Sequence, residues 1–254
     1  MFSEVQGLVK TNSGVQNVLG GGPVSDPNVI PVHAMVEHCR RRLEPVLTGR
    51  GGCRGLIVGC GNGDEAVYLG RAFHTSVVGV DLDSRFSPLA RGEGCVARGD
   101  VLCLPFDDLT FDFAAAFHSL EHVADTRAAL GEVYRVLRPG APFYVGVPNR
   151  KRIVGYVGSF DATAWQKITW NLIDWQARLE GRFENEQGAH AGFSREELLA
   201  LLRERFAAVE CLTREFLRLK YQGRLPRLLL DLLVSPRLLD YSAPSIYALC
   251  RRAE

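Results

Sequence analysis

Net charge is almost absent from this sequence of 254 residues. Thirty lysines and arginines against twenty-nine aspartates and glutamates leave a formal charge of +1 at neutral pH. The basic residues are scattered, and a short cluster such as Arg40-Arg41-Arg42 is typical of a solvated helix surface. A protein that binds nucleic acid usually concentrates its basic residues on one face, so we predict no nucleic-acid partner.

Cysteine pairs with the spacing of metal sites are also missing. The seven cysteines are odd in number and dispersed, and no two of them form a Cys-x-x-Cys pair. This pattern indicates reduced thiols, as in a cytoplasmic protein, and it predicts neither a metal site nor a disulfide framework.

Long apolar runs are the third absence. No stretch approaches the length of a membrane span, and the first residues lack the basic segment and apolar stretch of a secretory leader. We therefore expect a cytoplasmic protein without stable membrane insertion.

The sequence does contain a regular alternation of short apolar segments with helical patterns. Continuously apolar strands separated by helices are typical of a parallel sheet with both faces covered, so we predict a doubly wound, mostly parallel seven-stranded α/β sheet. The predicted strands cover residues 55–58, 76–80, 95–100, 111–117, 142–147, 207–217 and 245–251. The predicted helices cover residues 31–47, 64–72 and 125–137, and a further helix begins at a capping pattern formed by Ser194 and Glu197.

Composition divides the chain into four parts of what we predict to be a single domain. They are an irregular arm rich in Gly, Asn, Ser and Pro, a ligand-binding core, a helical insertion after the fifth strand and a C-terminal part, at residues 1–30, 50–150, 150–193 and 194–254. A structureless segment as long as the insertion is uncommon inside a compact domain, which favours a helical one.

A glycine-rich turn follows the first predicted strand. Gly59, Gly61 and Gly63 lie where the missing side chains let a ligand approach the backbone and the N-terminus of the next helix. Dinucleotides are bound by turns with the spacing Gly-x-Gly-x-x-Gly, and S-adenosylmethionine by Gly-x-Gly-x-Gly. The second spacing matches, since Asp64 stands where the dinucleotide pattern has its third glycine.

An acidic residue, Asp81, ends the next predicted strand. Its distance from the glycines is that at which a carboxylate binds the hydroxyls of a ribose. Both ligand classes predict this residue, so it indicates a nucleoside without choosing between them. The alternative interpretation is an aspartate that only caps the following helix.

Together with segments farther along the chain, these residues resemble the class I S-adenosylmethionine-dependent methyltransferases, in the branch that modifies small molecules. The matching segments, in the order of the family, are residues 56–63, 78–82, 99–106, 111–123 and 137–140. The resemblance implies a Rossmann-like methyltransferase fold, with S-adenosylmethionine as the cofactor and S-adenosylhomocysteine as its product.

The resemblance also implies which residues contact the cofactor. The glycine turn would line its amino-acid and ribose parts, Asp81 the ribose, Asp100 and Val101 the adenine, and Phe117 or His118 the methionine. Many relatives carry an acid where this chain has Ile57, so the contact to the amino group of the cofactor differs here. The implied cofactor-binding residues are Gly59, Cys60, Gly61, Gly63, Asp81, Leu82, Asp100, Val101, Phe117, His118 and His122.

Methyl transfer from a sulfonium is an in-line displacement, which needs a positioned nucleophile in a desolvated pocket rather than a covalent enzyme residue. We predict a small-molecule acceptor that is methylated at oxygen. A general base assists such a nucleophile, and histidine suits this role near neutral pH. His118 and His190 are the candidate catalytic residues, and a structural role is the alternative for each.

The segment after the fourth strand disfavours a nucleic-acid base as the acceptor. Enzymes of the family that methylate amino groups of bases often carry Asn/Asp-Pro-Pro-Tyr there, whereas residues 117–120 read Phe-His-Ser-Leu. Trp165, Trp170 and Trp175 predict either an aromatic lid over an apolar or planar acceptor or a helix packed on the sheet.

The leucines of residues 225–239 have three interpretations. They fit packing in the core, contact with a second subunit, or contact with a membrane surface. A homodimer is therefore one of the arrangements that the sequence allows.

Two other functions stay open. An NAD(P)-dependent oxidoreductase is disfavoured by Asp64 and by the lack of a Tyr-x-x-x-Lys pair that would handle a carbonyl proton. A non-catalytic nucleoside-binding protein is disfavoured by the intact glycines together with Asp81 and Asp100.

Overall fold

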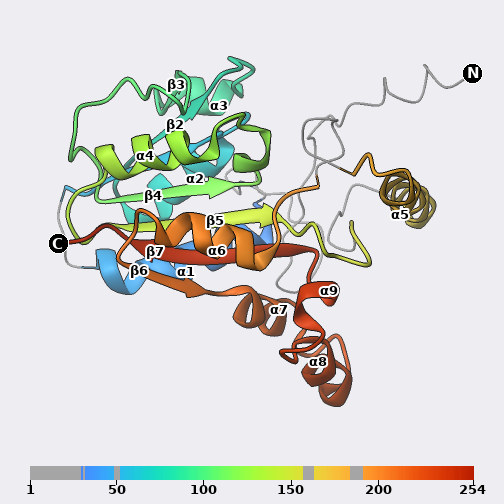
Figure 1. The fold of residues 1–254 in the computed structure, drawn as a ribbon. Coiled ribbons are helices and arrows are strands. Elements are labelled where there is room, and N and C mark those ends of the chain that lie inside the picture. The colour runs from blue at the N-terminus through green and yellow to red at the C-terminus, as the bar shows by residue number, and fades with distance from the viewer. Residues whose placement is uncertain (1–29, 31, 49–51, 157–162, 184–190) are drawn as a thin grey trace, which may run out of the picture.

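A seven-stranded sheet forms the centre of the molecule (Figure 1). The computed structural model describes residues 30, 32–48, 52–156, 163–183 and 191–254. The strands are β1 (Arg54–Val58), β2 (Ser76–Asp81), β3 (Val96–Arg98), β4 (Phe113–Phe117), β5 (Pro142–Pro148), β6 (Ala208–Cys211) and β7 (Ser245–Arg251).

The order of the strands is β3-β2-β1-β4-β5-β7-β6. Strands β1 to β5 pair in parallel, and β7 is antiparallel to both of its neighbours, β5 and β6. The predicted doubly wound, mostly parallel sheet is confirmed, and the antiparallel β7 makes it a mixed sheet at one side.

Helices cover both faces of this sheet. In the described residues they are α1 (Ala34–Leu47), α2 (Asp64–Phe73), α3 (Pro88–Gly92), α4 (Thr126–Val136), α5 (Ala164–Leu179), α6 (Arg195–Arg203), α7 (Thr213–Tyr221), α8 (Arg227–Leu233) and α9 (Leu239–Ser242). Helices α1, α2 and α7 contribute to the core on one face, and α4 and α6 to the core on the other.

The central strands are buried along their whole length because helices cover both of their faces. Every residue of β4 and β5 is buried, as continuously apolar parallel strands predict. Close packing also requires a glycine in β1, since a Cβ atom on Gly55 would lie only 2.2 Å from Cζ of Phe113.

The predicted helix start at Ser194 is confirmed by its hydrogen bonds. Ser194 Oγ accepts the backbone N–H of Glu197 at 3.2 Å, and Glu197 Oε2 accepts the backbone N–H of Ser194 at 3.1 Å. The start of α5 has the same reciprocal capping box, formed by Thr163 and Gln166.

The strand predicted for residues 207–217 is wrong in its second half. Strand β6 ends at Cys211, and α7 begins at Thr213. The buried Thr213 hydroxyl accepts the backbone N–H of Tyr247 at 3.0 Å, where a continued strand would have placed a backbone carbonyl. Leu212 and Phe216, four positions apart, then face the core from one side of the helix, so helical spacing describes this segment better than strand alternation.

Two long connections leave the edge of the sheet at which the parallel strands end, which we call the carboxyl edge. Residue Pro148 at the end of β5 pairs with Ser245 at the start of β7, so the connection from β5 to α6 and that from β6 to β7 both lie there. The first contains α5, which confirms the predicted helical insertion, and the second contains α7, α8 and α9 (Figure 1).

The leucine-rich segment 225–239 packs partly in the core. Leu230, Val234 and Leu239 are buried in the cluster beneath α1 and α7, whereas Leu228 and Leu232 point into solvent. In the part of the chain that the structure describes, no helix combines the length and the apolar character that a membrane span requires.

Candidate cofactor and acceptor site

The glycine turn between β1 and α2 is open toward the carboxyl edge. Gly59, Gly61 and Gly63 all have positive φ angles, of 65°, 56° and 87°. A Cβ atom on Gly59 would lie 2.2 Å from Cβ of Ser119, whereas a Cβ atom on Gly61 would meet nothing within 4 Å. The first glycine is therefore required by packing, and the second leaves open space next to the backbone where a ligand could lie.

Asp81 lies directly against this turn at the end of β2. Its Oδ2 accepts the backbone N–H of Gly61 at 2.8 Å, and its Oδ1 accepts that of Asp83 at 2.9 Å. The following helix, α3, is capped by Ser87, whose Oγ accepts the N–H of Ala90. The capping alternative for Asp81 is therefore excluded, and each carboxylate oxygen keeps a lone pair for a further donor.

The side chain of Asp64 stabilises the glycine turn through hydrogen bonds. Its carboxylate accepts hydrogen bonds from Asn62 Nδ2 at 2.8 Å and from Ser87 Oγ at 2.5 Å. The next residue, Glu65, also lies in the first turn of α2, and burial raises its pKa to about 7. Two carboxyl groups at this helix start make it a poor site for a pyrophosphate.

Residues 99–102, which follow β3, lie at the carboxyl edge beside Asp81. The backbone N–H of Gly99 donates to the carbonyl of Asp81 at 2.9 Å, which ties the ends of the two strands together. Asp100 turns the chain, since its Oδ1 accepts the N–H of Leu102 at 2.9 Å. Val101 packs against the core and the neighbouring Leu82 is exposed, so this segment offers both a polar and an apolar surface.

The chain leaves β4 through a constrained turn. Phe117 is buried, and His118 has a positive φ of 52°, a conformation that side chains other than glycine seldom adopt. The backbone N–H of His118 donates to the carbonyl of Gly146 at 2.8 Å, and Ser119 Oγ donates to that of Val58 at 2.9 Å. These bonds fix His118 at the carboxyl edge between β1 and β5.

A buried carboxyl group that sequence reasoning missed lies between two candidate histidines. The side chain of Glu121 is 1% exposed, and its Oε1 lies 4.0 Å from Nδ1 of His118 and 3.9 Å from Nε2 of His122. The available signal was an acidic residue next to His122 in the short segment from Leu120 to Val123. This places one buried carboxyl group beside both imidazoles at the carboxyl edge.

A second missed group lies beneath the site. His38 on α1 is buried, and its Nδ1 lies 2.9 Å from the hydroxyl of Tyr144 on β5. Burial lowers the pKa of His38, although Glu215, 3.4 Å from its Nε2, opposes this shift. The Tyr144 ring lies 6.0 Å from that of Phe117, so this polar group supports the floor of the site.

The remaining predictions concern His190 and the tryptophans of the helical insertion. His190 lies outside the described residues. On α5, Trp165 is exposed, whereas the indole N–H of the half-exposed Trp175 donates a hydrogen bond to the backbone carbonyl of Ile153 at 3.1 Å. The ring of Trp170 lies 5.2 Å from that of Tyr156.

Comparison with known proteins identifies the kind of domain that contains this edge. Residues 56–145 match the family described as "Methyltransferase domain". The chain contains a class I S-adenosylmethionine-dependent methyltransferase domain. The matched region holds the glycine turn, Asp81, Asp100 and the exit of β4, which are the segments that carried the resemblance in the sequence.

Named relatives share this methyltransferase domain. The chain is 34% identical over 119 residues to O-methyltransferase rstn1 of Aspergillus nomiae, which covers 43% of this chain and 53% of the relative. It is 31% identical over 126 residues to 27-O-demethylrifamycin SV methyltransferase of Amycolatopsis mediterranei, which covers 44% and 46%. The chain thus spans about half the length of these curated relatives.

A solved structure shows the same fold. The phosphoethanolamine N-methyltransferase 2 of Haemonchus contortus, in complex with S-adenosylhomocysteine, matches with a TM-score of 0.53 and 16% identity. The match covers 85% of this chain and 53% of that one.

The residues of the methyltransferase domain fit its cofactor, S-adenosylmethionine. The open space beside Gly61 lies next to a carboxylate, Asp81, that can still accept hydrogen bonds from ribose hydroxyls. The acidic first turn of α2 suits a ligand that carries an ammonium and a sulfonium rather than a pyrophosphate.

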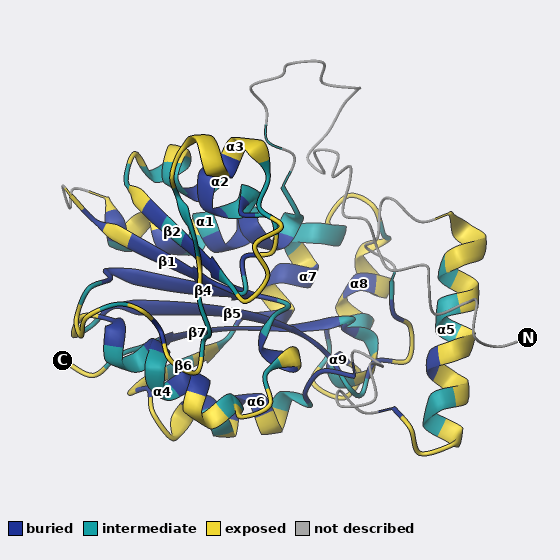
Figure 2. Cartoon of the chain, turned by 90° about the horizontal axis from the view of Figure 1, so that it is seen from above, coloured by how far each residue is buried: buried dark blue, intermediate teal, exposed yellow. Residues whose placement is uncertain are grey.

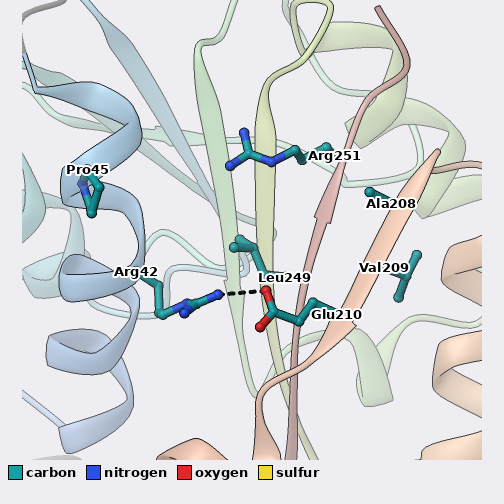
Figure 3. A pocket seen from close by; sticks show the side chains of 7 residues that line it. All are labelled: Arg42, Pro45, Ala208, Val209, Glu210, Leu249 and Arg251. Carbon is teal, nitrogen blue, oxygen red and sulfur yellow. Dashed lines mark hydrogen bonds and ion pairs between the residues drawn. The ribbon is translucent and has the colours of Figure 1, made fainter.

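A separate hollow lies away from this edge (Figure 3). It is lined by the last turns of α1 and by β6 and β7, and the ion pair between Arg42 and Glu210, at 2.6 Å, spans it. Ala208 and Arg251 line it at the end of the sheet opposite the carboxyl edge, so it is not part of the cofactor site.

Proposed function

We propose that the protein transfers the methyl group of S-adenosylmethionine to an oxygen atom of a small-molecule acceptor. The observation that carries the cofactor half of this proposal is the contact of Asp81 with the N–H of Gly61 beside an open turn. The oxygen acceptor is supported by the names of two relatives, O-methyltransferase rstn1 and 27-O-demethylrifamycin SV methyltransferase, and by the position of His118.

The cofactor would lie along the carboxyl edge of β1, β2 and β4. Asp81 would accept hydrogen bonds from the ribose hydroxyls, and Asp100 with Val101 would flank the adenine. The full proposed set is Gly59, Cys60, Gly61, Gly63, Asp81, Leu82, Asp100, Val101, Phe117, His118 and His122.

His118 is the proposed general base. When bound, the cofactor supplies a methyl group on a sulfonium, an electrophile that an oxygen nucleophile attacks in line. His118 would hold the hydroxyl group of the acceptor and take its proton during this attack. Glu121 is a positioning residue, since its carboxylate lies 4.0 Å from Nδ1 of His118 and would stabilise the imidazolium.

The cytoplasm is the proposed location. All seven cysteines are free thiols in the structure, and a reducing compartment keeps thiols in this form. Detection of the native protein in a secreted or membrane fraction would contradict this part of the proposal.

Calorimetric titration with S-adenosylmethionine, S-adenosylhomocysteine and NADH tests the cofactor. Binding of the first two and no binding of NADH is expected. Binding of NADH alone would favour the alternative of an NAD(P)-dependent oxidoreductase, although Asp64 stands where the dinucleotide-binding pattern has its third glycine. Cofactor binding without turnover in a screen of phenols, hydroxy acids and amines would instead favour a non-catalytic nucleoside-binding protein.

The pH dependence of turnover tests the base. Once an acceptor is known, His118→Gln should lower kcat by a larger factor than it weakens cofactor binding. Glu121→Gln should shift the acidic limb of the pH–rate profile to lower pH, because loss of the carboxylate makes the imidazole easier to deprotonate. An unchanged profile in both variants would remove this pair from the reaction.

A further inference from the structure

A lysine at the carboxyl edge is partly buried without an acidic partner. Lys220 lies in the last turn of α7, a helix on the side of the molecule toward which the parallel strands run (Figure 2). Its side chain is partly covered by the protein. Within the described ranges of the chain, no carboxylate forms an ion pair with its amine, and the charges that act on it most are both positive.

Other covered cations near this edge are paired with carboxylates. The buried Arg152 bonds to Asp174 at 2.7 Å, and the partly buried Arg195 bonds to Asp240 at 2.6 Å. A charge that is removed from water is costly unless an opposite charge compensates it. The compensation for Lys220 therefore has to come from a group other than the residues that the structure describes.

The amine of Lys220 lies on the side of α7 that faces the sheet. Phe216, four positions earlier, is on the same side of the helix, and its ring centre lies 4.1 Å from that of Tyr247 on β7. The amine is 5.8 Å from the ring of Phe216 and 5.6 Å from that of Tyr221. Lys220 thus continues a buried aromatic contact by one helical turn, toward the open end of the sheet.

The start of α1 connects Lys220 with the turn that holds His118. His33 is the N-cap of α1, and burial, reinforced by repulsion from Lys220, lowers the pKa of His33 to about 4. Two residues later, Met35 packs against Gly146 of β5, where a Cβ atom would lie 2.6 Å from Sδ of Met35. The carbonyl of Gly146 accepts the backbone N–H of His118. Lys220 and the proposed base therefore border the same part of the carboxyl edge.

His33 adds a neutral hydrogen-bond donor to this part of the edge. With a pKa of about 4, its imidazole is uncharged at neutral pH. Its Nδ1 accepts the backbone N–H of Met35 at 3.2 Å, so the ring proton is on Nε2. A cation together with a neutral N–H suits an oxyanion, because negatively charged oxygens accept hydrogen bonds from both.

A second lysine brings positive charge from α5. Lys167 lies on the side of α5 that faces the protein, seven positions before Asp174, which is bonded to the buried Arg152. Burial, followed by repulsion from Arg224 and Lys167, lowers the pKa of Lys220 to about 8. Basic groups from two connections of the sheet therefore converge here, although the chain as a whole has a net charge of only +1.

We infer that the methyl acceptor carries an oxyanion, a carboxylate or a phosphate group, and that Lys220 binds it. The inference rests on the proposed methyl transfer, and it makes Lys220 a specificity-determining residue that holds one end of the acceptor while His118 meets its hydroxyl group. A protonated amine would be repelled by the same charges. The burial of an uncompensated charge lowers the stability of the protein alone, and binding of the anionic acceptor offsets this cost.

Thermal unfolding of the full chain in the presence of small anions tests this inference before the acceptor is known. The probes are benzoate and inorganic phosphate, and sodium chloride at equal ionic strength is the reference. At least one probe should raise the Tm of wild type in a saturable way. Lys220→Met should weaken the apparent affinity by about tenfold or more, the scale of one charge-assisted hydrogen bond. The matched control is Lys151→Met, which removes an amine paired with Glu196 at the surface and should respond as wild type does.

The two probes also distinguish the two sources of an oxyanion. A Lys220-dependent response to benzoate would identify the acceptor as a carboxylic acid, and one to phosphate would identify it as a phosphate ester. Equal responses of Lys220→Met and wild type would overturn the inference, as would a wild type that responds to neither probe. Loss of the positive charge should not unfold the protein, because it removes an uncompensated group.

Titration of the same three proteins with S-adenosylmethionine separates this inference from the proposed function. All three should bind the cofactor. Cofactor binding without any response to the anions would overturn only the anionic acceptor. A wild type that does not bind S-adenosylmethionine would contradict the proposed methyl transfer itself, and with it the role of Lys220 in holding a methyl acceptor.

Discussion

Helices α4 and α5 show two opposite uses of an amphipathic pattern. Helix α4, in the cofactor-binding half, buries Leu130 and Val133 against the sheet. Helix α5, in the β5–α6 connection, buries Asp174 and exposes Leu172. The first is held by apolar area removed from water and the second by a few polar contacts, so the two regions should respond differently to mutation.

The largest expected effect is the loss of the ion pair beneath α5. Asp174→Ala would leave the buried Arg152 guanidinium without its carboxylate, at a cost of about 3 to 5 kcal/mol. We expect this cost to appear as local release of α5, seen as faster amide exchange in residues 164–179, with the exchange of β4 unchanged. The control is Asp231→Ala, which removes an exposed partner of Arg218 and should cost less than about 1 kcal/mol. Uniform loss of protection throughout the sheet would contradict the separation of the two regions.

The next effect is expected with pH, at Lys220 on α7. Burial, reinforced by repulsion from Arg224 and Lys167, lowers the pKa of Lys220 to about 8. Between pH 8 and the higher pKa of an unfolded lysine, the unfolded state binds more protons, so stability should rise with pH in this interval.

Denaturant unfolding across that pH interval checks this prediction. Lys220→Met keeps the apolar stem that packs near Phe216 but cannot be protonated. It should be more stable than wild type near pH 7, and the difference should shrink as pH rises. Equal stability of the two proteins at both ends of the interval would show that the amine of Lys220 is solvated.

Loss of the cofactor carboxylate comes third. Asp81→Asn should weaken S-adenosylmethionine binding by about 1 to 3 kcal/mol, the cost of a charge-assisted hydrogen bond and of a looser Gly61 contact. Calorimetry measures the change, and Asp83→Asn in the same loop, whose carboxylate pairs with the exposed Arg85, is the control. Full affinity in Asp81→Asn would exclude this residue from the ribose site.

The smallest expected effect is the loss of one N-cap, which should act differently on α5 and α6 although both begin with a capping box. Ser194→Ala and Thr163→Ala each remove an N-cap worth about 1 kcal/mol. Because α6 packs on the core, Ser194→Ala should lower the global free energy of unfolding. Thr163→Ala should leave it unchanged and raise amide exchange only in α5. Equal global losses would mean that α5 unfolds together with the sheet.

Much of the fold could be predicted because its signals are local. The apolar residues of β1, β4 and β5 are consecutive, a pattern typical of strands covered on both faces. The second half of the strand predicted for residues 207–217 could not be recovered in this way. Its apolar residues fit both periodicities, and the buried Thr213 contact that ends β6 joins it to a strand 34 positions away.

The same division holds within the site. Gly59, Gly61, Gly63 and Asp81 were predicted together because parallel strands bring their carboxyl ends to one edge. Glu121 was missed, since an acid next to two histidines in sequence gives no sign of whether it is buried between them. The alternative role of Asp81 as a helix cap was excluded only when the structure assigned that cap to Ser87.

By itself, the sequence determined the doubly wound sheet, the glycine turn and the cofactor class, because these follow from residues that are neighbours in the chain or lie at a fixed spacing. Only the tertiary structure decided which side of α5 faces the protein. An amphipathic pattern specifies two unlike faces, but their orientation depends on what each one meets. Here the buried Arg152 reaches Asp174 from another segment, so Asp174 faces the protein and Leu172 stays exposed.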